Sequence, residues 1–142
     1  MYHNPASKLK NDDTKLQITP IPVFTDNYVW ALHNSTDCII VDPGLAGPVL
    51  DFLHQQHLQL NAILITHWHA DHTGGISDLL RHQSVPVYGP ANSAINGISH
   101  PVHDSNTITL LGQPFSVLAV PGHTLDHLAF YDCNNAILFC GD

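Results

Sequence analysis

The chain has 142 residues, of which 44% are hydrophobic and 11% are charged, so it is long enough for one domain with a substantial core. Four basic residues against twelve acidic ones give a net charge of -8, which argues against a nucleic-acid-binding surface. No apolar run approaches the roughly 20 residues of a membrane span, and residues 1–15 lack the apolar segment of a secretory signal. We therefore expect neither a nucleic acid nor a membrane as a partner.

Residues 1–15 are polar and predict a flexible leader ahead of a domain that covers residues 16–142. The three cysteines each lie in or beside an apolar strand pattern, at Cys38, Cys133 and Cys140. Their odd number and these surroundings favour buried free thiols in a reducing compartment. Together with the lack of a secretory signal, they predict a cytoplasmic protein.

Predicted strands and helices alternate through the first part of the domain, which indicates an α/β fold. Apolar runs predict strands at 16–19, 29–33, 38–41, 62–65 and 85–88, and then at 107–111, 115–120, 128–131 and 136–140. Helical spacing of apolar residues predicts a helix at 48–57, and residues 76–82 are expected to start a second helix. Pro20 and Pro22 are expected to separate the first two strands, and His100 and His103 to be surface histidines in a polar loop.

Three histidines and one aspartate follow the strand predicted at 62–65, namely His67, His69, Asp71 and His72. Four such groups at the mouth of a buried strand are costly to desolvate unless something compensates them, and a divalent metal does so. Side chains two positions apart in an extended segment leave on one face, so His67 and His69 can bind one ion. Asp71 and His72 lie where the chain turns toward the next helix, and this displaced pair suits a second ion about 3.5 to 4 Å from the first.

Two later strands also end at candidate ligands. The apolar run at 117–120 is followed by Pro-Gly and His123, and the run at 137–140 is followed by Gly141 and Asp142. A lone histidine is more often structural, but His123 lies in the same relation to its strand as His67 does. Three strand ends on one side of a sheet would bring these residues to a single site.

The segments T-H-W-H-A-D-H, P-G-H-T-L-D-H and C-G-D, in this order, resemble the motifs of the metallo-β-lactamase superfamily. Within it, F-T-D-N-Y-V-W from Phe24, V-D-P-G from Val41 and V-Y-G-P from Val87 are similar to bacterial glyoxalase II, the hydroxyacylglutathione hydrolases. The resemblance implies an αβ/βα sandwich, of which this chain would hold mainly the first half. The domain at 16–142 would then be incomplete at its C-terminus.

The resemblance also implies a site with two metal ions. By matching position, the first ion would be held by His67, His69 and His123 and the second by Asp71 and His72, with Asp142 bridging the two. Zinc is the expected metal, with iron or manganese as alternatives. The second site would be incomplete, because a further histidine that binds the second metal in the family has no counterpart in residues 1–142. Asp71 is the candidate catalytic residue, since it could orient the attacking water. His127 is implied to be a supporting residue, not a ligand.

The implied activity is hydrolysis of an S-(2-hydroxyacyl)glutathione, such as S-lactoylglutathione, to a 2-hydroxy acid (lactate) and glutathione, a reaction of methylglyoxal detoxification. Two alternatives stay open. One is a persulfide dioxygenase of the same superfamily with a single iron held by His67, His69, His123 and Asp142. The other is a metal-binding fragment without catalytic activity. Half of a two-sheet sandwich would expose an apolar face, which predicts oligomerisation or aggregation of the chain.

Overall fold

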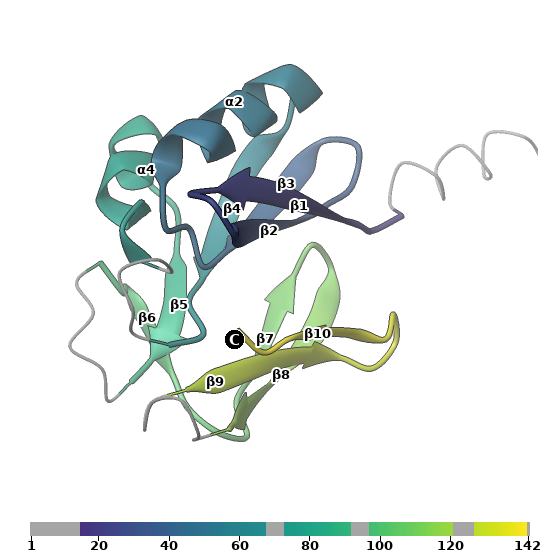
Figure 1. The fold of residues 1–142 in the computed structure, drawn as a ribbon. Coiled ribbons are helices and arrows are strands. Elements are labelled where there is room, and N and C mark those ends of the chain that lie inside the picture. Colours follow the sequence, from purple (N-terminus) through teal and green to yellow (C-terminus); the bar gives the residue numbers. More distant parts are fainter. Residues whose placement is uncertain (1–14, 68–72, 92–96, 121–126, 142) are drawn as a thin grey trace, which may run out of the picture.

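The computed structural model describes residues 15–67, 73–91, 97–120 and 127–141 (Figure 1). The first sheet and the helices that accompany it consist of β1 (Gln17–Val23), β2 (Asn27–His33), β3 (Asp37–Val41), α2 (Ala46–Gln56), β4 (Gln59–Leu64), α4 (Ile76–His82), β5 (Val87–Pro90) and β6 (His100–Val102). The second sheet consists of β7 (Thr107–Leu110), β8 (Gln113–Ala119), β9 (Leu128–Asp132) and β10 (Ile137–Phe139). The predicted leader at 1–15 falls almost entirely outside the described residues.

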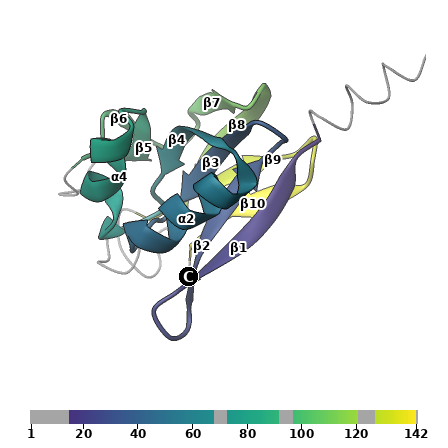
Figure 2. The ribbon, with the colours of Figure 1, turned by 90° about the horizontal axis from the view of Figure 1, so that it is seen from above.

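The two sheets differ in strand number and in direction. The first has six strands in the order β1-β2-β3-β4-β5-β6, antiparallel from β1 to β3 and parallel from β3 to β6. The second has four antiparallel strands in the order β10-β9-β8-β7. Helices α2 and α4 cover one face of the first sheet, and the second sheet packs on the other (Figures 1 and 2). Because β3, β4 and β5 are parallel, their carboxyl ends meet at one edge of the sheet.

Two hydrophobic cores lie on the two faces of the first sheet. Along β3, Cys38 and Ile40 belong to the core under the helices, whereas Ile39 and Val41 belong to the core between the sheets. A strand that is buried on both faces reads as a continuous apolar run, which is why the sequence shows no alternation here. From the other sheet, Phe115 is fully buried in the second core, where such a side chain contributes about 1.5 to 3 kcal/mol.

The predicted α/β fold is confirmed, and most of the predicted elements are present. The helix whose start was predicted at 76–82 is present as α4. The prediction that Pro20 and Pro22 separate the first two strands is wrong, because β1 continues through both prolines to Val23. The polar loop predicted around His100 and His103 is also wrong in part, since His100 begins the short strand β6.

The cysteines correspond only in part to the prediction of buried thiols. All three are free, but Cys133 and Cys140 are exposed. Cys38 lies in the core, and burial raises the pKa of its thiol to about 12. The Cys38 thiol therefore stays protonated at neutral pH and is a poor nucleophile. None of the helices in the described part of the chain is long and apolar enough to cross a membrane.

Gly75 brings the start of α4 into contact with the loop that follows β3. Its backbone N–H donates to the carbonyl oxygen of Pro43 at 2.7 Å. A Cβ atom at Gly75 would lie 2.8 Å from the Ala46 nitrogen and from the Pro43 oxygen, and 2.9 Å from the Leu45 carbonyl carbon. All three are backbone atoms, which cannot move aside as a flexible side chain would.

Replacing Gly75 with alanine should therefore lower the free energy of unfolding by about 1 to 3 kcal/mol, the usual cost of overpacking. Gly47 is a matched control, because a Cβ atom there would meet nothing within 4 Å and the residue lies inside α2. Gly47→Ala should stabilise the protein by about 0.5 to 1 kcal/mol, since alanine loses less backbone entropy in a helix. Urea unfolding of both variants is the measurement, and equal effects would contradict the close contact at Gly75.

Candidate metal centre

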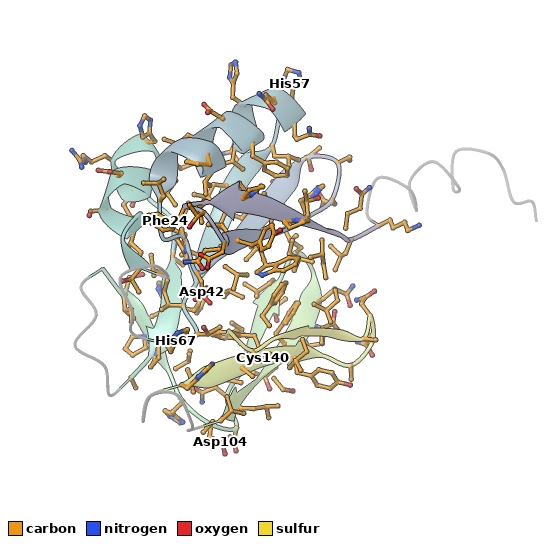
Figure 3. The ribbon with its side chains drawn as sticks, viewed as in Figure 1. Phe24, Asp42, His57, His67, Asp104 and Cys140 are labelled. Atoms are coloured by element: carbon orange, nitrogen blue, oxygen red, sulfur yellow. The ribbon has the colours of Figure 1, made fainter. Side chains whose placement is uncertain are left out.

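The candidate site lies where strands from both sheets end. Just beyond β3, the backbone N–H of Asp42 donates to the carbonyl oxygen of Leu64 at 2.8 Å. Just beyond β4, the carbonyl oxygen of Thr66 accepts from the N–H of Leu128 in the second sheet at 2.7 Å. Figure 3 shows Asp42, His67 and Cys140 at this edge, on segments from the two sheets. These backbone hydrogen bonds therefore fix the carboxyl ends of β3 and β4 and the start of β9 relative to one another.

His67, the first predicted ligand, has an environment that suits metal binding. Its ring is fully buried, and Nδ1 lies 2.9 Å from the hydroxyl oxygen of Thr66. That hydroxyl donates its own proton to Oδ2 of Asp42 at 2.7 Å, so it can only accept from Nδ1–H of His67. The proton is thereby held on Nδ1, and Nε2 of the ring carries the lone pair that a metal ion requires.

Asp42 positions this arrangement, although the sequence motifs included it only within the V-D-P-G segment and assigned it no role at the site. Its carboxylate is buried and accepts twice from Thr66, at 2.8 Å from the backbone N–H and at 2.7 Å from the hydroxyl. Asp42 has a φ of 55°, a left-handed conformation that aspartate and asparagine tolerate better than most residues. A signal was present in the sequence, because a carboxylate directly after a central parallel strand lies beside the end of the neighbouring strand.

His127 lies against His67 in the way expected of a supporting residue. The two rings are stacked with their centroids 4.6 Å apart. Nε2 of His127 donates to the carbonyl oxygen of Cys140, so this nitrogen is engaged by the backbone at the end of β10. The N–H of Val120 donates to the carbonyl oxygen of His127 at 2.9 Å. His127 thus joins the ends of β8 and β10 to the ring of His67.

Gly141 lets the chain that leaves β10 pass close to these side chains. It has a φ of 73°, and a Cβ atom there would lie 2.7 Å from the Thr66 hydroxyl, 2.8 Å from Nε2 of His127 and 3.0 Å from Nδ1 of His67. Any other residue would collide with the side chains that hold His67 in place. The glycine of the C-G-D segment is therefore required by packing as well as by backbone conformation.

Of the six predicted metal ligands, the structure places His67. The other five lie outside the described residues, namely His69, Asp71, His72, His123 and Asp142. In the described part of the chain, no three histidine, cysteine, aspartate or glutamate side chains gather as a metal site would require. The buried imidazole with its Nδ1 proton held by a hydroxyl fits a metal ligand, so the described part of the site is compatible with a metal ion.

The model of the metallo-beta-lactamase superfamily matches residues 22–142. The chain belongs to the metallo-beta-lactamase superfamily. This agrees with the fold class and the family that the sequence motifs predict. The superfamily also implies a bound divalent metal, in keeping with the environment of His67.

Among curated superfamily members, the chain is similar to hydroxyacylglutathione hydrolases. It is 53% identical over 129 residues to that of Photobacterium profundum, covering 89% of this chain and 50% of the relative. It is 49% identical over 129 residues to that of Nitrosomonas eutropha, again with 89% and 50% of the two chains covered. The chain thus spans about half the length of the curated relatives that it matches.

Several solved structures are similar to the chain in fold. The BLEG-1 B3 metallo-beta-lactamase superposes with a TM-score of 0.79 at 27% identity, with 89% of this chain and 72% of that chain covered. TTHA1623 in a di-iron-bound form has a TM-score of 0.71 at 27% identity, with coverage of 87% and 71%. ETHE1 from Myxococcus xanthus has a TM-score of 0.72 at 25% identity, with coverage of 90% and 57%.

Proposed function

We propose that the chain carries the metal-binding part of a thioester hydrolase that converts S-(2-hydroxyacyl)glutathione, with S-lactoylglutathione as the expected substrate, to a 2-hydroxy acid and glutathione. The observation that carries this proposal is the identity of about half of the residues to hydroxyacylglutathione hydrolases over 89% of the chain. We further propose a cytoplasmic protein that acts in methylglyoxal detoxification, as this substrate implies.

The proposed metal site uses the residues predicted from the motifs. His67, His69 and His123 would hold the first ion, Asp71 and His72 the second, and Asp142 would be shared. When bound, a divalent metal lowers the pKa of a water molecule and polarises the carbonyl of the substrate. Zinc is the proposed metal, and iron is an alternative because the similar TTHA1623 was solved in a di-iron-bound form.

The side chains around the proposed site would orient the ring of His67 and the attacking water. Asp42 and Thr66 hold His67 in the tautomer that can bind a metal, and His127 fixes the plane of its ring by stacking. Asp71 is proposed to accept a hydrogen bond from the attacking water and so to direct it at the thioester carbonyl. A thiolate is a weakly basic leaving group, so its departure requires little help from a general acid.

A hydrolysis assay tests the proposed function directly. The zinc-loaded chain should consume S-lactoylglutathione, and treatment with a chelator should reduce the rate to that of the uncatalysed reaction until zinc is restored. Loss of the ultraviolet absorbance of the thioester is the suitable readout, because the exposed Cys133 and Cys140 would react with thiol reagents. His69→Ala is the matched variant and should behave like the chelated protein.

The same assay separates the two alternatives. A persulfide dioxygenase would consume oxygen with glutathione persulfide when loaded with iron and would leave the thioester intact. A metal-binding fragment without activity would bind zinc and turn over neither compound. Either result would contradict the proposed thioester hydrolysis, while metal binding itself would still stand.

A further inference from the structure

The turn that precedes β7 lies along the end of β8. Residues 103–106 connect β6 to β7. The N–H of Ser105 donates to the carbonyl oxygen of Val117 at 2.9 Å, and the N–H of Val117 donates to the carbonyl oxygen of Asn106 at 2.8 Å. Ser105 has a φ of 75°, a left-handed conformation that is uncommon for serine, so this segment is a turn and not a further stretch of β7.

The carboxylate of Asp104 takes the place of a backbone acceptor at the end of β8. In an antiparallel sheet, the N–H groups along a strand point to its two neighbours in alternation. The N–H of Val117 points to the β7 side, whereas that of Val120 donates to the carbonyl oxygen of His127 on the β9 side at 2.9 Å. The N–H of Ala119 therefore belongs to the β7 side, and there it donates to Oδ1 of Asp104 at 2.8 Å (Figure 3).

Ala119 lies between two of the proposed ligands of the first metal ion. It is the last residue of β8, four positions before His123 in the sequence. On the other edge of β8, Ala119 pairs with Leu128, whose N–H donates to the carbonyl oxygen of Thr66 at 2.7 Å. The position of Ala119 therefore bears on His123 through the short length of chain between them, and on His67 through the backbone pairing.

The contact of Asp104 repeats one that Asp42 makes at the neighbouring strand end. Asp42 follows β3 and accepts from the N–H of Thr66, directly before His67. Asp104 follows β6 and accepts from the N–H of Ala119. The two differ because Asp42 also accepts from the Thr66 hydroxyl and so controls the tautomer of His67. Toward Ala119, Asp104 has only to provide an acceptor oxygen.

We propose that Asp104 is a positioning residue of the metal centre, which holds the end of β8 so that His123 can bind the first ion without further ordering of this backbone. The inference rests on the proposed ligand set, because that set assigns His123 to the first ion. The hydrogen bond to Ala119 is present before a metal binds, so binding does not have to order the end of β8. Loss of the acceptor should weaken zinc binding about fivefold, the effect of one ordinary hydrogen bond.

The test compares Asp104→Ala with Asp104→Asn. With alanine, the zinc dissociation constant of the tight event, measured by competition with a chelating dye, should rise about fivefold. Asparagine keeps an acceptor oxygen for Ala119, so its dissociation constant should stay within about twofold of that of the unaltered chain. Both variants remove the same negative charge, so a difference between them does not come from long-range attraction of the cation. Hydrogen exchange of the Ala119 amide in the metal-free protein should become faster with alanine and stay slow with asparagine.

Asp132 provides a matched control for loss of stability without loss of positioning. Its carboxylate is buried and accepts from the N–H of Asn134 at 2.9 Å, in the turn between β9 and β10, away from the end of the second sheet that meets His67 (Figure 1). Because Asp132 is buried and Asp104 is exposed, Asp132→Ala should lower the midpoint of thermal unfolding more than Asp104→Ala does. Its zinc affinity should nevertheless stay within about twofold at a temperature where the chain is folded. Asp132→Asn, which keeps an acceptor for Asn134, takes its place if the alanine variant does not fold.

Three results would overturn the proposal. Unchanged zinc affinity in Asp104→Ala, with tight binding in the unaltered chain, would leave the metal centre standing and show that Asp104 supports only the turn. An equal loss of affinity in Asp104→Asn would show that the charge of the carboxylate, and not the hydrogen bond to Ala119, is responsible. An equal loss in the Asp132 variant would trace the effect to general loosening of the second sheet. A chain that binds no zinc would contradict the proposed metal centre itself, and this inference with it.

Discussion

Replacing Asp42 with alanine is expected to lower the free energy of unfolding by about 2 to 5 kcal/mol, because two buried donors of Thr66 lose their acceptor. The φ of 55° adds to this cost, since alanine is strained in the left-handed region. The affinity for zinc should also fall, by about 10-fold to 100-fold, the usual effect of removing a residue that orients a metal ligand. Urea unfolding and zinc competition against a chelating dye measure the two effects separately.

The Asp42→Asn variant separates two roles of Asp42, its contribution to the stability of the fold and its control of the tautomer of His67. Asparagine tolerates the same backbone conformation and can still accept from the N–H of Thr66, so the loss of stability should be smaller than with alanine. Its amide N–H₂ would donate to the Thr66 hydroxyl, which could then donate to Nδ1 of His67. The proton would move to Nε2 and block metal binding there.

The asparagine variant should therefore bind zinc about as weakly as the alanine variant while being more stable. Nitrogen NMR of the metal-free protein would report the tautomer of His67 in each case. Zinc affinity that is close to that of the unaltered chain in Asp42→Asn would contradict the role assigned to the Asp42, Thr66 and His67 series of hydrogen bonds.

The central strands were predictable because their sequence pattern is set by burial alone. In residues 38–41 of β3 and 62–64 of β4, every residue faces one core or the other, so apolar residues follow each other without interruption. The prediction for β1 failed because prolines usually end strands. Here β1 is an edge strand, and Pro20 and Pro22 lie two positions apart. Their backbone nitrogens therefore point to the same side of the strand. On the side of an edge strand that has no neighbour, a missing N–H costs no hydrogen bond within the sheet.

Strand β6 could not have been predicted from local sequence. It has three residues, of which one, Val102, is buried, and it contains Pro101. Its pairing with β5 comes from the position of the neighbouring strand, not from a pattern of its own. The candidate site was likewise predictable only in part. The histidine motif that begins at His67 could be recognised in the sequence. The contacts that Asp42 and His127 make around His67 could not, because they depend on how β3, β4 and β9 are placed in space.

Removing His69 should affect metal binding far more than removing His72. Among residues 1–142, the first proposed metal ion would have four ligands, His67, His69, His123 and the shared Asp142. This set can complete tetrahedral coordination. The second has Asp71 and His72 with the other share of Asp142, so water must fill more of its coordination sphere. Because each missing protein ligand lowers the affinity for zinc, the second ion should bind more weakly than the first. We therefore expect one tightly bound zinc per chain and a second only in excess metal.

Titration calorimetry of the metal-free chain with zinc is the measurement. In His69→Ala the tight binding event should disappear, because the first ion would lose one of its three imidazoles. In His72→Ala the tight event should persist with the same stoichiometry, and only the weak event should be lost. The two variants remove the same side chain from the same short segment, so each serves as the control for the other. The reverse result, with tight binding lost in His72→Ala and retained in His69→Ala, would mean that the ligands are divided between the two ions differently from the proposed assignment.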